Sequence, residues 1–475
     1  MSAEGLAAAR RAMERRGIDP VAIKAFDRFY GMLEGGAQGL IPESTIAPLT
    51  GVPALGEVEA SEEERREALR RVAIVKLNGG LGTSMGLTGP KTVLKVRGDL
   101  TFLDIIARQV LALRARFGVD LPLLLMNSFR TREESLAALA AYPDLPVDGL
   151  PLDFVQNAEP KLTADTLEPV HWPADPSLEW CPPGHGDVYT SLAATGVLDR
   201  LREKGIRYIF LANADNLGAT CDPDIAAWLL ADDVPYAAEV CERTANDRKG
   251  GHLAVRRSDG QLVLRDSAMV APGEDRYFQD NVRHPLFHAN NIWVDLDVLA
   301  GLLDQRGGVL ELPIIVNRKT VDPTDKSSTK VIQIESAMGA AIEVFPGSRA
   351  IAVPRSRFRP VKSTNELLLV QSDVFDLDDD ANLVSTIDHP EPSILLSSAY
   401  AMVPDFQARF PHGVPSMRDC TSLTVTGDAT FGAGVRCVGD VEVTRDGDIA
   451  DGSVLGGRSG EDTTDVGAAD EGTIG

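Results

Sequence analysis

Apolar residues near the start of the chain recur at three- and four-residue spacings, the period of an amphipathic helix. The pattern covers residues 6–17 and 20–36, and the acidic stretch EVEASEEERREALRR follows further on. This stretch leads into RVAIVKLN at residues 71–78, whose β-branched apolar residues are typical of a strand. We therefore predict an N-terminal helical region over residues 1–70.

Beyond residue 71, short apolar runs typical of buried strands alternate with helical patterns. LPLLLMNS precedes REESLAALAAY, IRYIFLANAD precedes DPDIAAWLLADD, and AIAVP precedes STNELLLVQSDVF. Such alternation is typical of a largely parallel sheet with helices on both faces. The sequence thus predicts an α/β domain, which we place at residues 71–380.

After residue 380 the pattern changes to short, turn-rich apolar segments. The segment LTVTGDATFGAGVRCVGDVEV places small apolar residues before Gly-Asp or Gly-x-Gly turns. Val425, Phe431 and Val441 lie at multiples of roughly six residues, which favours short β-helix coils over residues 381–455. An ordinary β-meander would give a similar pattern. Residues 456–475 are rich in Gly, Asp and Thr with almost no core-forming side chain, so we expect a disordered tail.

The composition is that of an ordinary globular protein, with 475 residues of which 44% are hydrophobic and 25% charged. No 18-residue apolar run occurs and the N-terminus lacks the apolar core of a signal peptide, so we expect a cytoplasmic protein without a membrane span. The net charge of -23 argues against nucleic acid or an anionic membrane as partner. A phosphorylated substrate would therefore need a locally basic pocket.

A glycine-rich turn, GGLGTSMGLTGPK, directly follows the strand predicted at 71–78. Backbone amides of such a turn can approach an anion closely. The turn is not a dinucleotide fingerprint, because Met85 stands where a glycine is needed, and it is not a Walker A loop, because Pro90 precedes Lys91. A merely sharp turn is the alternative, but Lys91 at the exit favours phosphate binding.

This loop, LNGGLGTSMGLTGPK, resembles the signature of eukaryotic-type UTP-glucose-1-phosphate uridylyltransferases. Six further blocks resemble that family in the same order: FVQNAEPKL, PPGHGD, LANADNLGA, ANNIWVDL, VIQIESAMGAAIEVF and VPRSRFRPVKSTNELLLVQSD. The resemblance implies a Rossmann-like, GT-A-like nucleotidyltransferase domain with a mixed sheet flanked by helices, and a small C-terminal left-handed β-helix. A β-helix edge also offers a route to a homo-oligomer.

The activity implied by the resemblance is transfer of a uridylyl group from UTP to glucose 1-phosphate, with release of pyrophosphate. Such a reaction needs positioning and cationic stabilisation rather than a covalent nucleophile. The resemblance assigns catalysis to Lys91 and Lys362. Arg355, Arg357, Arg359 and Lys362 supply the locally basic segment, although on an extended segment the three arginines would share one face and some could form salt bridges instead.

The remaining roles implied by the resemblance fall into three groups. Nucleotide binding is assigned to the glycine loop and two later blocks, through Leu77, Asn78, Gly79, Gly80, Gln156 and Gly184. Binding of the sugar phosphate is assigned to His185, Asn213, Gly251, Asp266, Asn290 and Asn291. Asp215 follows an apolar strand and suits Mg²⁺, which prefers oxygen ligands, although an Asx turn is the plainer interpretation.

The sequence departs from the family pattern in the expected sugar site. Family members usually have NTNN where this chain has His288-Ala289-Asn290-Asn291, Glu where it has Asp266, and a small hydroxyl residue in place of His252. The identity of the hexose therefore stays open. Two alternatives remain: a UDP-N-acetylhexosamine pyrophosphorylase or related UDP-sugar pyrophosphorylase, and a noncatalytic nucleotide-binding regulator.

Overall fold

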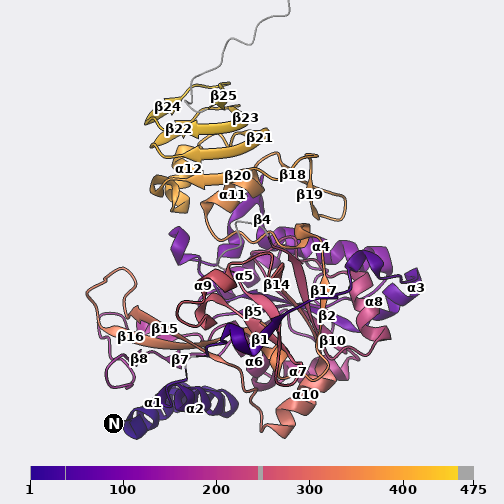
Figure 1. Ribbon diagram of the computed structural model, residues 1–475, viewed down its shortest axis with the longest axis vertical. Helices are drawn as coiled ribbons and strands as arrows, with labels where there is room; N and C mark the ends of the chain where they lie inside the picture. Colours follow the sequence, from indigo (N-terminus) through magenta and orange to yellow (C-terminus); the bar gives the residue numbers. More distant parts are fainter. Residues whose placement is uncertain (1, 38, 244–249, 458–475) are drawn as a thin grey trace, which may run out of the picture. The chain divides into compact units, whose positions relative to one another are not determined.

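The computed structural model describes residues 2–37, 39–243 and 250–457 (Figure 1). The chain forms two compact units. The first comprises residues 1–79, 110–214 and 219–358, and the second comprises residues 80–109, 215–218 and 359–475. Within the described parts of the chain, no helix combines the length and the apolar character needed to cross a membrane.

A seven-stranded mixed sheet forms the centre of the first unit (Figure 1). Its strand order is β17-β11-β14-β10-β2-β5-β6. The strands are β2 (Val72–Asn78), β5 (Leu123–Asn127), β6 (Asp153–Val155), β10 (Tyr208–Asn213), β11 (Tyr236–Glu242), β14 (Leu286–Asp295) and β17 (Arg349–Ala352). Strand β14 runs antiparallel to both its neighbours, whereas the other pairings are parallel. The predicted mixed α/β fold is confirmed.

One face of this sheet is buried under α6 (Val188–Ala194), α7 (Val197–Glu203) and α10 (Leu296–Gln305). Alternate strand residues such as Val75 and Leu211 point into this core, as the two-residue period of a strand requires. Helices α5 (Arg132–Leu139) and α8 (Pro223–Ala231) also occur where the sequence predicts them. Helix α8 packs with α3 (Glu62–Leu69).

The N-terminal helices α1 (Ser2–Arg15) and α2 (Pro20–Glu34) confirm the helical pattern at the start of the chain. Asp19 caps α2 by accepting a hydrogen bond from the Val21 amide, and proline suits the first helical position. Met13, Phe26 and Phe29 pack in a core with Ile334. That core includes the small sheet of β8 (Leu162–Thr163), β15 (Ile314–Thr320) and β16 (Lys330–Ser336).

A second small sheet in the first unit carries residues of the expected sugar site. It contains β1 (Ile46–Pro48), β12 (His252–Arg256) and β13 (Leu262–Arg265), paired antiparallel in that order. His252 pairs with Arg265 at its edge. The register therefore brings Gly251 and Asp266, one residue beyond each end of this pair, close together.

The second unit contains stacked parallel strands at its C-terminal end (Figure 1). They are β20 (Ser393–Leu396), β21 (Ser416–Val425), β23 (Arg436–Val443) and β25 (Val454–Gly457), and β22 (Ala429–Phe431) pairs in parallel with β24 (Gly447–Ile449). Val425, Phe431 and Val441 are all buried, as the pattern predicts. The predicted disordered tail lies outside the described residues, apart from residues 456 and 457, which belong to β25.

Candidate active site

Two lysines converge on one carboxylate in the second unit. Lys91 Nζ lies 2.8 Å and Lys362 Nζ 2.7 Å from the same oxygen, Oδ2 of Asp215. Lys91 Nζ also donates to the carbonyl oxygen of Val361. The other carboxylate oxygen, Asp215 Oδ1, is buried and has no hydrogen-bond partner among the described residues. This cluster carries two positive charges and one negative charge.

The backbone around Asp215 holds the cluster in place. The Val361 amide donates to the carbonyl oxygen of Asp215 at 3.1 Å, and the Arg359 amide donates to Asn216 Oδ1 at 2.9 Å. Lys362 stands immediately before α11 (Thr364–Gln371), whose N-cap is Ser363. The loop from residues 359 to 362 is therefore fixed at both ends, and Lys362 reaches Asp215 from it.

Electrostatics keep Asp215 ionised. Burial by itself raises the pKa of this carboxyl group, but the neighbouring Lys362 and Lys91 outweigh that effect and hold the pKa below its usual range. The lysines differ in exposure, because the Lys91 side chain is 12% exposed and that of Lys362 is 58% exposed. Lys362 is the more accessible cation of the two.

The glycine loop of the second unit turns back on itself between Gly80 and Lys91, whose amide donates to the Gly80 carbonyl at 3.4 Å. Gly82 and Gly86 have φ angles of 61° and 74°, the left-handed region that glycine adopts without strain. They flank a single 3-10 turn over Thr83–Met85. The predicted glycine-rich turn after β2 is confirmed.

In the first unit, the end of β2 lies against Gln156. A Cβ atom on Gly79 would approach Gln156 Nε2 to 2.6 Å, so glycine is required for this contact. The Gln156 amide donates to the Asn127 carbonyl at 2.8 Å. Leu77 is half-buried. Asn78 is buried, and its Nδ2 donates to both Asn127 Oδ1 and Ser135 Oγ at 2.7 Å, so its side chain supports the strand end.

The Gly184–Asp187 turn packs against the end of β16. Gly184 has a φ angle of 82°, and a Cβ atom there would lie 2.6 Å from the Ser336 carbonyl oxygen. The Met338 amide donates to His185 Nδ1 at 3.0 Å, which directs the other ring nitrogen away from the backbone. The close approach of backbone to backbone explains the two glycines in GHGD.

Four residues in the region of the expected sugar site lie close together around β12, β13 and β14. They are Gly251, Asp266, His288 and Asn290. The Gly251 carbonyl accepts from the His288 amide at 3.0 Å, and a Cβ atom on Gly251 would lie 3.3 Å from Asp266 Oδ2. The Asn290 amide donates to His288 Nδ1 at 3.1 Å. Asn290 has a φ angle of 56°, an uncommon conformation for a residue other than glycine. Asn213, at the end of β10, is half-buried.

The model of the family described as UTP-glucose-1-phosphate uridylyltransferase matches residues 26–437. The chain belongs to this family. The potato (Solanum tuberosum) UTP-glucose-1-phosphate uridylyltransferase is 39% identical over 427 residues, covering 88% of this chain and 85% of the relative. The Saccharomyces cerevisiae enzyme of the same name is 38% identical over 405 residues, covering 84% of this chain and 80% of the relative.

Solved structures agree with the family assignment. The crystal structure of a UDP-glucose phosphorylase from Trypanosoma brucei has a TM-score of 0.89 and 40% identity, covering 96% of this chain and 99% of the other. A mutant UDP-glucose pyrophosphorylase from Leishmania major, in complex with UDP-glucose, has a TM-score of 0.89 and 38% identity with the same coverage. The likeness therefore extends over almost the whole chain.

In this member of the uridylyltransferase family, the side chain of Asn291 forms hydrogen bonds within the protein. Its side chain is fully buried, and Nδ2 donates to Glu239 Oε2 at 3.0 Å and to the Arg357 carbonyl at 3.3 Å. Glu239 also accepts from Trp293 Nε1 at 3.0 Å. Asn290 and Asn291 thus differ in burial, because Asn291 is fully buried on Glu239 whereas Asn290 is half-buried.

The basic segment does not form the extended strand that we expected. Arg355–Arg357 form a 3-10 turn, so the three arginines do not share one face. Arg355 donates to the Glu242 carbonyl, Arg357 pairs with Glu239, and Arg359 pairs with Glu391. Each guanidinium is held by the protein's own acceptors, which leaves Lys362 as the cation of this segment that reaches Asp215.

Sequence reasoning gave no role to two buried acids that organise the first unit. Asp187 accepts hydrogen bonds from Asn157 and Ser191, and Glu239 accepts from Arg357, Asn291 and Trp293. A signal for Glu239 was available, since it is flanked on both sides by apolar residues in the strand YAAEVCE. An acid inside such a strand needs a buried partner.

Proposed function

We propose that this chain transfers the uridylyl group of UTP to glucose 1-phosphate, giving UDP-glucose and pyrophosphate in a reversible reaction. The observation that carries the proposal is the pair of lysines on Asp215, in a chain that matches the uridylyltransferase family over most of its length. The names of the curated relatives and the solved structures with UDP-glucose support this substrate pair.

The proposed reaction is an in-line displacement. A phosphate oxygen of glucose 1-phosphate attacks the α-phosphorus of UTP, forming a new P–O bond as the bond to pyrophosphate breaks. Negative charge develops on the phosphoryl oxygens and the leaving group, so the protein contributes position and positive charge rather than a nucleophile. We assign this stabilisation to Lys91 and Lys362.

Asp215 is the residue that we propose as ligand of a divalent cation, Mg²⁺ by preference. Its buried Oδ1 has no partner within the described chain, which leaves one carboxylate oxygen for a cation while Oδ2 serves the lysines. A single carboxylate is enough for Mg²⁺, which takes phosphates and waters as its other ligands. When bound there, Mg²⁺ would neutralise charge on the triphosphate and orient it.

For UTP we propose contacts with the residues to which the family resemblance assigns nucleotide binding. Gln156 presents both a donor and an acceptor, as the uracil edge requires. Leu77, Gly79, Gly80 and Gly184 would contact the nucleotide mainly through backbone. The contribution proposed for Asn78 is likewise limited to its backbone, because its side chain is already paired with Asn127 and Ser135.

For the sugar phosphate we propose His185, Asn213, Gly251, Asp266 and Asn290. Hydroxyl groups of the hexose would pair with the Asp266 carboxylate and the Asn290 amide, and an unpaired buried group would penalise the wrong sugar. Asn291 would then act indirectly, by holding the strand through Glu239. A UDP-N-acetylhexosamine substrate and a noncatalytic regulator remain the alternatives to be tested.

The division of the chain into regions 1–70, 71–380, 381–455 and 456–475 is also a proposal. Partners are 18 residues apart where residues 422–425 of β21 pair with β23 and where β22 pairs with β24, as in Ser422 with Asp440 (440 − 422) and Phe431 with Ile449 (449 − 431). Three six-residue segments per coil would produce this spacing, which supports our proposal of a left-handed β-helix. We also propose a GT-A-like catalytic domain, a cytoplasmic location and a homo-oligomer formed through the β-helix.

The function is tested with purified protein, Mg²⁺ and UTP, offered a panel of hexose 1-phosphates while pyrophosphate release is measured. We expect release with glucose 1-phosphate and little with N-acetylglucosamine 1-phosphate. The opposite preference would establish the first alternative. Absence of release with every sugar would refute the enzymatic function.

A further inference from the structure

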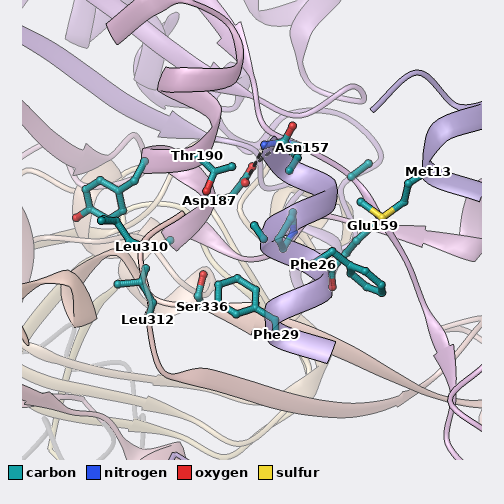
Figure 2. A pocket seen from close by; sticks show the side chains of 16 residues that line it. Met13, Phe26, Phe29, Asn157, Glu159, Asp187, Thr190, Leu310, Leu312 and Ser336 are labelled. Atoms are coloured by element: carbon teal, nitrogen blue, oxygen red, sulfur yellow. Dashed lines mark hydrogen bonds between the residues drawn. The ribbon is translucent and has the colours of Figure 1, made fainter. Parts of the chain in front are cut away.

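Asp187 connects the two loops to which nucleotide binding is assigned in the first unit. Its carboxylate accepts three hydrogen bonds. Two come from Asn157, through its backbone amide at 2.6 Å and its Nδ2 at 2.9 Å (Figure 2). The third comes from Ser191 Oγ at 2.6 Å. The side chain is buried, so these protein donors replace its water. Asp187 ends the Gly184–Asp187 turn and Asn157 directly follows Gln156.

These bonds restrain Gln156 from its C-terminal side. The amide of Gln156 already donates to the Asn127 carbonyl at 2.8 Å, and Gly79 lies against its side chain. The Asp187 carboxylate accepts hydrogen bonds from both the backbone amide and the side chain of Asn157, the residue after Gln156. Charge-assisted hydrogen bonds are short and strong, so this attachment is stiffer than one between neutral groups.

We propose that Asp187 is a positioning residue for the uracil end of UTP, which acts by holding Asn157 and therefore Gln156 relative to the Gly184 turn. The proposal rests on the uridylyltransferase function proposed above. It concerns a group that contacts no substrate: the ionised carboxylate orders the loops, and the loops bind the nucleotide. The ionised carboxylate accepts these hydrogen bonds more strongly than a neutral carboxyl group would.

A second buried acid, Glu159, lines a small cavity that Asp187 also lines (Figure 2). The volume of this cavity is about 10 Å³, roughly the room for the centre of one water molecule. Glu159 is 1% exposed, one of its oxygens accepts from the Ile334 amide, and Oε1 has no partner among the described residues. The two carboxyl groups of Glu159 and Asp187 therefore occupy similar surroundings with very different numbers of donors.

The unequal donors shift the pKa values of the two acids by different amounts. Burial raises the pKa of Glu159 well above its usual range, and the charges of Asp187 and Glu335 raise it further. Burial also raises the pKa of Asp187, but Ser191 and Asn157 limit the rise to about 6. At neutral pH, Asp187 is therefore mainly ionised.

The other elements around the cavity add little charge. Helices α1 and α2 contribute the apolar side chains of Met13, Phe26 and Phe29, and the loop at residues 310–312 contributes two leucines (Figure 2). Ser336 lies at the end of β16, beside Glu335. His185 and Tyr189, each two residues from Asp187, are the nearest titratable groups in the sequence. Asp187 therefore loses its ionised form as the pH falls through about 6.

The experiment compares Asp187→Asn with Glu159→Gln in the full-length protein. Both substitutions replace a buried carboxyl by an isosteric amide, but only the first alters the acceptor of the three hydrogen bonds from Asn157 and Ser191 and points an amide donor at Asn157. We expect D187N to raise the KM for UTP about tenfold or more, with kcat and the KM for glucose 1-phosphate changed less than about threefold, as expected for lost positioning of one substrate. We expect E159Q to leave all three values within about twofold.

The pH dependence and a rescue variant separate positioning from general damage. The ratio of wild-type to D187N kcat/KM for UTP should fall toward one below pH 6, since UTP titrates identically in both assays. The double variant N157D/D187N exchanges donor and acceptor, and should recover at least part of the lost UTP affinity. Should D187N fail to fold, Ser191→Ala and Asn157→Ala, which each remove one donor, should raise the KM for UTP alone.

Four results would overturn the proposal: equal effects of D187N on both KM values, an E159Q variant as impaired as D187N, a ratio independent of pH, or a double variant no better than D187N. Wild-type turnover in the same assay reports separately on the proposed function. If the wild-type protein releases no pyrophosphate with any hexose 1-phosphate, the function itself is refuted rather than the role of Asp187.

Discussion

Arg357 and Glu239 form a bidentate ion pair inside the first unit. Arg357 Nε donates to Glu239 Oε2 at 2.7 Å, and Arg357 Nη2 donates to Glu239 Oε1 at 2.7 Å. Glu239 is fully buried. Burial alone raises the pKa of Glu239, but Arg357 outweighs it and keeps the pKa below the usual range. The pair also holds Asn291, next to Asn290 in the proposed sugar site.

Removing one partner of this pair should destabilise the protein strongly. We expect Glu239→Gln to lower the free energy of unfolding by about 3–5 kcal/mol, because it removes the bidentate partner of the buried Arg357 charge and leaves the longer ion pair with Asp222 at 3.5 Å. The matched control is Asp232→Asn, which breaks the half-exposed pair with Arg349. That change should cost less than about 1 kcal/mol. Urea unfolding of the two variants checks the difference, and equal losses would contradict the assigned importance of the buried pair.

Loss of either active-site lysine should affect turnover rather than folding. We expect Lys362→Ala and Lys91→Ala to lower kcat by about 100- to 1,000-fold, the usual effect of removing one preorganised charge-stabilising group. Lys95→Ala is the control, because Lys95 forms an ordinary surface pair with Asp99 and has a 63% exposed side chain. The measurement is initial rate of pyrophosphate release. A K362A variant with near wild-type kcat would refute its catalytic role.

The contact between Gly79 and Gln156 predicts a variant that binds UTP poorly yet folds well. A Cβ atom at residue 79 would lie 2.6 Å from Gln156 Nε2, at the flexible end of that side chain. We expect Gly79→Ala to displace the Gln156 amide and raise the KM for UTP severalfold, with little change in thermal unfolding. Gly56→Ala is the control, since nothing lies within 4 Å of its Cβ position. An unchanged KM for UTP would argue against Gln156 as a base-binding residue.

His288 should make the stability of the protein depend on pH. Burial, aided by the neighbouring His185, lowers the pKa of His288 to about 4. An unfolded histidine has a pKa near 6.5, so between about pH 6.5 and 4 the unfolded chain binds more protons than the folded one. The stabilising contribution is complete above about pH 6.5 and is lost as the pH falls toward 4.

The variant His288→Asn carries the residue usual in the family and lacks this titration. We expect wild-type stability, relative to H288N, to fall by about 1 kcal/mol per pH unit between pH 6 and 5. Urea unfolding of both proteins at pH 7, 6 and 5 measures this difference, in which all other titrating groups cancel. Parallel curves for the two proteins would show that His288 titrates normally.

Local patterns in the sequence determined the elements of this fold. The apolar run at residues 72–78, followed at once by glycines, can form little else than a strand and a tight turn, and β2 and its loop are found there. The helical periods in the first 36 residues and the short apolar segments after residue 380 likewise appear as predicted. These signals are local, because hydrogen-bonding period, capping and turn chemistry depend on neighbours in the chain.

Only the tertiary structure decided which side chains meet and which become unavailable. Asp215 joins Lys91 and Lys362 across 124 and 147 residues of sequence, a convergence that no local pattern encodes. Asn291 was expected to bind the sugar phosphate, yet its side chain is buried on Glu239, as is that of Arg357, for which a salt bridge had stayed open. The partner of a buried polar group is set by strand register and by the cost of leaving it unpaired, which depend on the whole fold.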